Sequence, residues 1–177
     1  MLVRFACARE SPHNLGVKRH MLLVRAIASF LALPGLVAFA IPIWIGSSAG
    51  PARHLAPAAV LLCLGTLLLL WSVREFYAAG RGTLAPWDPP RHLVTSGPYR
   101  ISRNPIYIGV ATILVAWCLL WDSRMLAAYS VLFLIAVHLR VVRYEEPWAA
   151  RHFGSEWDAY RNRVPRWVIW RGRAFDL

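Results

Sequence analysis

Four long apolar runs constrain this chain more than any other feature of its sequence. They cover roughly residues 22–45, 55–79, 106–121 and 125–139. A helix needs about 20 residues to cross roughly 30 Å of hydrocarbon, and about 17 residues is the lower limit. The first two runs reach this length, and the other two come close to it with the help of flanking residues. The sequence therefore predicts an all-α, polytopic membrane protein with about four transmembrane helices.

A soluble bundle of four buried helices is the alternative fold, and it requires a polar outer face on each helix. Residues 61–71 read Leu-Leu-Cys-Leu-Gly-Thr-Leu-Leu-Leu-Leu-Trp and offer no such face. The chain is 58% hydrophobic and 16% charged. An ordinary soluble chain has roughly 45–50% apolar and about 25% charged residues. Both observations favour a membrane protein over a soluble bundle.

The positive charge of the chain predicts its orientation in the membrane. Nineteen Arg and one Lys, Lys18, give a formal net charge of +11. Short cytosolic loops of membrane proteins are enriched in Arg and Lys. Sixteen of the basic residues precede the first run, connect the second to the third, or follow the fourth, whereas only Arg53 and Arg124 occupy the other two connections. We therefore expect both termini and the central loop to face the cytosol, in a protein of the cytoplasmic membrane. The expected partner is the lipid bilayer and not nucleic acid.

The runs also define the organisation of the chain. Residues 1–20 are polar and irregular and predict a flexible N-terminal segment, followed by a single membrane domain over residues 21–177. Only residues 122–124 separate the third and fourth runs, which predicts an antiparallel helical hairpin. The cysteines, Cys7, Cys63 and Cys118, are far apart and belong to no Cys/His cluster. We therefore expect neither a disulfide framework nor a metal site.

A long central loop, residues 80–104, connects the second and third runs, and long ordered loops are usually functional. Asn104 is a good N-cap and Pro105 suits the first helical position, so the third helix is expected to begin here. A cap alone is one interpretation of this pair. An anion site is the other, because the free N–H groups of a helix N-terminus bind carboxylates. The side chains expected beside it are Tyr99, Arg100, Arg103 and Tyr107.

A second polar cluster follows the fourth run. If that helix continues, its spacing brings Arg140, Arg143 and Tyr144 to one face. Glu145 and Glu146 then point about 100° apart, so that one faces inward and the other faces water. Two interpretations of this acidic pair stay open. It is either a solvated pair with local Arg partners or a binding partner for a cationic ligand group.

The C-terminal tail predicts one more short helix. Gly154 is expected to end the preceding helix, and Ser155 to cap a short amphipathic helix that Pro165 terminates. That helix is expected to lie on the membrane surface or over the site. Its aromatic residues and the one beyond it are interpreted as packing and interface anchors: Trp157, Tyr160 and Trp167.

Taken in order, these clusters resemble a known family. Residues 93–109 read Leu-Val-Thr-Ser-Gly-Pro-Tyr-Arg-Ile-Ser-Arg-Asn-Pro-Ile-Tyr-Ile-Gly, and an apolar hairpin follows. Then come Glu145-Glu146, Phe153-Gly154, Tyr160 and Val164-Pro165-Arg166. This arrangement is similar to the isoprenylcysteine carboxyl methyltransferase family and the related phospholipid methyltransferases, over about residues 80–167. The chain departs from the family pattern at Asn104, where the family has His. Asn can form hydrogen bonds but cannot carry a proton at neutral pH.

The resemblance implies a methyltransferase that uses S-adenosylmethionine (SAM), with residues 80–167 as its cofactor-binding catalytic part. The implied acceptor is lipophilic or lipid-linked, with an isoprenylcysteine-like carboxylate as the expected group. A carboxylate pairs with the ammonium of SAM, and arginines pair with an anionic acceptor. Arg140, Arg143 and Glu145 are therefore the expected catalytic residues. The cofactor contacts implied by position are His92, Leu93, Val94, Tyr99, Asn104, Pro105, Tyr107, Glu145 and Glu146.

Two other functions stay open at this point. One is a nicotinamide-dependent membrane reductase of related architecture, which would bind NADPH in preference to SAM. The other is a non-catalytic membrane partner protein, which would retain SAM binding without turnover.

Overall fold

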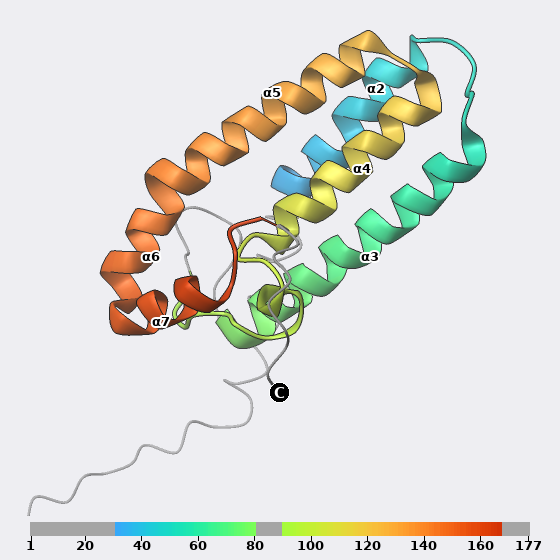
Figure 1. Ribbon diagram of the computed structural model, residues 1–177. Coiled ribbons are helices and arrows are strands. Elements are labelled where there is room, and N and C mark those ends of the chain that lie inside the picture. The colour runs from blue at the N-terminus through green and yellow to red at the C-terminus, as the bar shows by residue number, and fades with distance from the viewer. Residues whose placement is uncertain (1–30, 81–89, 168–177) are drawn as a thin grey trace, which may run out of the picture.

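The computed structural model describes residues 31–80 and 90–167, and the regular secondary structure of this part of the chain is entirely helical, without a strand (Figure 1). The expected flexible segment 1–20, the start of the first apolar run and residues 81–89 of the central loop lie outside the described residues. The all-α prediction is confirmed for the part described. In chain order the elements are η1 (Leu31–Ala40), α2 (Ile41–Ser47), α3 (Leu55–Gly80), η2 (Gly97–Arg100), α4 (Pro105–Trp121), α5 (Arg124–Arg140), η3 (Val141–Glu145), α6 (Glu146–Phe153) and α7 (Ser155–Arg163).

Among the described residues, two helices are long and apolar enough to cross a membrane. They are α3, with a mean hydropathy of 2.1, and the continuous helix Arg124–Phe153, with a mean hydropathy of 2.0. The helices Pro34–Ser47 and Pro105–Trp121 are also apolar but shorter. Large apolar side chains such as Leu67 of α3 and Leu132 of α5 point away from the protein core and are exposed. An outward-facing apolar surface of this kind suits lipid and not water.

Helices α3 and α4 pack closely because glycines face each other at their contact. A Cβ atom on Gly109 would lie 2.9 Å from the backbone nitrogen of Leu69 and 3.0 Å from the carbonyl oxygen of Gly65. Small residues allow helix backbones to approach in this way, and the approach strengthens van der Waals packing. The fully buried side chains of Leu69 and Ile113 lie in the same core.

The antiparallel hairpin predicted from the short link is confirmed. Helix α4 ends at Trp121, and its C-cap residue Asp122 adopts a left-handed conformation with φ of 47°. Ser123 then caps α5, because its side chain accepts a hydrogen bond from the backbone N–H of Leu126. Figure 1 shows α4 and α5 adjacent at this link and separating towards α6. The site lies at the end where they separate.

Two hydrogen bonds attach the first helix to the hairpin from far along the sequence. The indole N–H of Trp117 donates to the carbonyl oxygen of Ala38 at 2.8 Å. The hydroxyl of Tyr129 donates to the carbonyl oxygen of Val37 at 3.0 Å. Element η1 is therefore held against α4 and α5, where it forms one wall of the site.

Candidate functional site

A cavity of about 650 Å³ lies between η1, the central loop, α4, α5 and the η3–α6 segment. Its inner part is apolar and is lined by Val37, Val110 and Phe133. Its other part carries the arginines and glutamates of both polar clusters. The cavity has the size of a small-molecule or cofactor site, which typically measures roughly 300–1,000 Å³.

Glu145 connects three elements at the centre of the polar part. The hydroxyl of Tyr107, in the first turn of α4, donates to its Oε1 at 2.6 Å. The Nε–H of Arg140, at the end of α5, donates to the same oxygen at 2.7 Å. No group of the described chain forms a hydrogen bond with Oε2 of this carboxylate. Glu145 is thus oriented by two donors and keeps one oxygen for a further partner.

The helix continues past Arg140 as expected, but the segment that carries Glu145 is a π-helix and not an α-helix. The N–H of Glu146 donates to the carbonyl oxygen of Val141, five residues earlier. A π turn is wider than an α turn, so it rotates less per residue, and such turns are frequent at functional sites. The prediction that one glutamate faces water is therefore wrong, because Glu145 and Glu146 both line the cavity.

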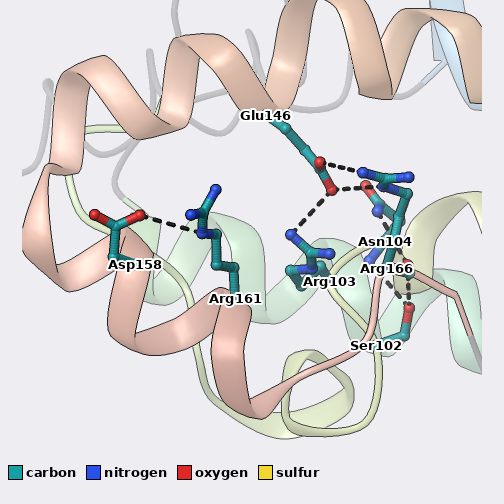
Figure 2. A network of polar contacts seen from close by, with 7 residues as sticks. All are labelled: Ser102, Arg103, Asn104, Glu146, Asp158, Arg161 and Arg166. Carbon is teal, nitrogen blue, oxygen red and sulfur yellow. Dashed lines mark hydrogen bonds and ion pairs between the residues drawn. The ribbon is translucent and has the colours of Figure 1, made fainter.

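Glu146 is the acceptor of a clamp that involves two arginines (Figure 2). Arg166 donates to both of its oxygens, from Nε at 2.8 Å and from Nη2 at 2.7 Å. Arg103 approaches Oε1 through Nη1 at 3.0 Å. The hydrogen bonds to Glu146 raise the pKa of the Arg166 guanidinium, whereas burial lowers that of Arg103. Of the two open interpretations, local Arg partners are thus observed for both glutamates, although neither is fully solvated.

The residues after α7, which we call the C-terminal strap (164–167), bind the start of α4. The backbone N–H of Arg103 donates to the carbonyl oxygen of Pro165 at 2.9 Å. The carbonyl oxygen of Arg166 accepts from the hydroxyl of Ser102 at 3.0 Å and from the side-chain amide of Asn104 at 3.1 Å. Asn104 occupies the N-cap position as predicted, but its side chain makes no capping hydrogen bond. It binds the strap instead.

The short C-terminal helix forms, with one correction to its predicted cap. Gly154, with φ of 54°, ends α6 and also precedes α7, whose first residue is Ser155. Ser155 is therefore inside the helix and does not cap it. Trp157 and Tyr160 are buried in a small apolar cluster, as the packing interpretation predicted, but they also line the cavity. The Tyr160 hydroxyl donates to the carbonyl oxygen of Tyr99 at 2.8 Å, and burial raises the pKa of both tyrosines.

The structure brings together nearly all of the site residues expected from the sequence. Pro105 is the exception, because it is fully buried in the first turn of α4 and does not line the cavity. The expected residues that do line it are His92, Leu93, Val94, Tyr99, Asn104, Tyr107, Arg140, Arg143, Glu145 and Glu146.

Several lining residues were not among the expected contacts. The sequence indicates Arg103 only as part of the basic surroundings of the α4 N-terminus. Others lie on α6 and α7, where the sequence indicated packing for Trp157 and Tyr160: Trp148, Arg151, Phe153, Trp157 and Tyr160. Within the described ranges, no group of three or more His, Cys, Asp or Glu side chains could hold a metal ion.

Comparison with known proteins identifies the family. No curated protein and no solved structure matches the chain. A family model described as phospholipid methyltransferase matches residues 53–156 of the 177. The match extends from the start of α3 into α7 and includes the Tyr107–Glu145 contact and the acceptor of the arginine clamp. Since it covers more than half of the chain, and since two helices can cross a bilayer, this integral membrane protein belongs to the phospholipid methyltransferase family.

Proposed function

We propose that this protein is a SAM-dependent methyltransferase that modifies a lipophilic or lipid-linked acceptor, with an isoprenylcysteine-like carboxylate as the expected group. One observation supports the proposal above all others. A single cavity joins a polar end, built from glutamates and arginines, to an apolar interior walled by η1, α4 and α5. A polar cofactor and an apolar acceptor can meet in such a cavity.

The donor set of the cavity fits SAM. SAM, when bound, supplies an electrophilic methyl group on a cationic sulfonium, and it also carries an ammonium and a carboxylate. The Oε2 atom of Glu145 is available to an ammonium, because both bonds from neighbouring side chains go to Oε1. Residues 92–94 of the central loop line the same cavity. Holding reactants in line accounts for much of the rate of such a displacement.

Arg140, Arg143 and Glu145 are the proposed catalytic residues, with different tasks. Arg140 is occupied by Glu145, so it orients that carboxylate and balances its charge. Arg143 lines the cavity and makes no ion pair with any described residue, so it is the better placed of the two arginines for an anionic acceptor. Tyr107 donates its hydroxyl proton to Glu145 and therefore positions the carboxylate.

We extend the proposal to the topology. Helices α3 and Arg124–Phe153 account for two spans, and the shorter apolar helices Pro34–Ser47 and α4 would supply the other two. An even number of spans agrees with the distribution of basic residues, which favours cytosolic termini in the cytoplasmic membrane. The polar end of the cavity would then face the cytosol, where SAM is made, and the apolar interior would face the bilayer.

Titration of the detergent-purified protein with SAM by isothermal calorimetry tests the proposed cofactor. We expect saturable binding that Glu145→Gln weakens by at least tenfold. Glu156→Gln is the matched control, because Glu156 is an exposed residue of α7 that does not line the cavity. Binding of NADPH in place of SAM would support the reductase instead. Binding of SAM without turnover on any acceptor would support the non-catalytic partner.

A further inference from the structure

The wall of the cavity holds a positive charge that no described carboxylate balances. Arg103 and Arg166 share the single carboxylate of Glu146. The other glutamate of the cavity, Glu145, is occupied by Arg140 and Tyr107. No further Asp or Glu among the described residues lines the cavity. The cluster of two guanidinium groups and one carboxylate therefore carries one excess positive charge.

Arg103 is the more buried of the two arginines and the one that lines the cavity. Its side chain is 12% exposed, against 33% for that of Arg166. It lies over the ring of Trp157, with its guanidinium carbon 5.4 Å from the ring centre. Burial and stacking fix its position, and Figure 2 shows its guanidinium beneath Glu146. Such a fixed arginine loses little conformational freedom when it binds a ligand.

The guanidinium of Arg103 is also short of partners. It makes one contact with a carboxylate, through Nη1. Its Nε is buried and has no hydrogen-bond partner. The nearby Arg161 turns away to Asp158 and adds positive charge rather than relieving it (Figure 2). Buried donors in native proteins are nearly always satisfied, so an unpaired one together with an excess charge indicates a missing acceptor.

We propose that Arg103 is a second anion-binding residue of this cavity besides Arg143, and that its guanidinium pairs with an oxyanion of the bound ligands. The inference rests on the proposed function and deepens it. Two sources offer the same chemistry, namely the carboxylate of SAM and the anionic group of the acceptor. A planar guanidinium recognises an oxyanion through paired N–H donors, which a lysine ammonium cannot reproduce.

The test compares SAM with decarboxylated SAM, which lacks only the carboxylate, by calorimetry on the detergent-purified protein. If the cofactor supplies the oxyanion, the wild type binds SAM at least tenfold more tightly than it binds decarboxylated SAM. Arg103→Lys then removes most of this preference and leaves the affinity for decarboxylated SAM unchanged. Arg53→Lys is the matched control, because Arg53 forms an exposed pair with Asp122 outside the cavity.

A second arm of the test compares, by the same calorimetry, the binding of N-acetyl-S-farnesylcysteine with the binding of its carboxamide. If the acceptor supplies the oxyanion, Arg103→Lys removes the preference for the carboxylate and leaves SAM binding unchanged. The inference is overturned if Arg103→Lys changes neither preference. Arg103→Gln, which keeps a donor without the charge, provides a second variant if the lysine variant does not fold. Absence of SAM and decarboxylated SAM binding to the wild type would instead contradict the proposed function itself.

Discussion

Replacing Glu146 by Gln is the perturbation whose effect follows most directly from the structure. The carboxylate accepts two hydrogen bonds from Arg166, at 2.7 and 2.8 Å, and contacts Arg103 at 3.0 Å, with 16% of its side chain exposed. Gln keeps the volume but replaces one acceptor with a donor that faces two guanidinium groups. Removing one partner of a buried ion pair costs about 3–5 kcal/mol.

The expected loss of stability is smaller than for a fully buried ion pair, because one third of the Arg166 side chain is exposed and water screens its charge. We expect the free energy of unfolding to fall by about 2–3 kcal/mol, after this discount for solvent. For a chain of this size each kcal/mol lowers the melting temperature by roughly 2–4 °C. Thermal unfolding of the detergent-purified variant, followed by circular dichroism, should therefore show a decrease of roughly 4–12 °C.

Two comparisons make this prediction refutable. Glu156→Gln changes the same chemical group at an exposed site of α7, where loss of a favourable helix-dipole interaction costs at most about 1 kcal/mol. The double variant Glu146→Gln/Arg166→Gln should lose less free energy of unfolding than the two single variants lose in sum, because the partners interact directly. Equal melting temperatures for Glu146→Gln and Glu156→Gln would contradict the clamp.

Three further predictions concern the helices and the site. Gly109→Ala should lower the free energy of unfolding by about 1–3 kcal/mol, because its Cβ would lie 2.9 Å from the backbone of α3. Gly80→Ala should cost less in the same melting assay, because its two nearest neighbours are side-chain atoms at 3.1 Å. Tyr107→Phe removes one of two hydrogen-bond donors to Glu145. Calorimetry should therefore show the affinity for SAM reduced roughly tenfold, as for a lost charged hydrogen bond. An unchanged affinity would argue against the positioning of Glu145 by Tyr107. Asp122→Val should destabilise by about 1–2 kcal/mol, while Asp122→Gly should change stability by less than about 1 kcal/mol, because only glycine adopts the observed left-handed φ of 47° without strain. Equal melting temperatures for the two Asp122 variants would refute this.

The features that the sequence predicted correctly are local ones. Hydrophobic runs and their boundaries predicted the helices, because burial and lipid contact depend on the composition of each segment. The link at residues 122–124 predicted the hairpin, since so short a connection leaves no other geometry. The two polar clusters could be placed at one site only through the family resemblance, which related residues 93–109 to Glu145 and Glu146.

The features that could not be predicted from the local sequence depend on contacts between residues far apart in the chain. Asn104 is a cap by position, yet its amide binds a carbonyl oxygen 62 residues away. A π turn brings both glutamates to the cavity in place of an α turn. Residues 141–145 contain no Gly or Pro that would predict this change. The role proposed for Arg103 depends on its buried, unpaired Nε and on the carboxylate that it shares with Arg166, and local sequence indicates neither. Propensity and spacing describe neighbours along the chain and carry little information about such pairings.

Transfer of a labelled methyl group tests the central claim most directly. The purified protein is incubated with methyl-labelled SAM and with N-acetyl-S-farnesylcysteine or a membrane lipid extract, and the organic phase is counted. Our account predicts label in the lipophilic fraction for the wild type and for Glu156→Gln, and a loss of at least tenfold for Glu145→Gln. No transfer by the wild type to either acceptor, or equal transfer by Glu145→Gln, would contradict it.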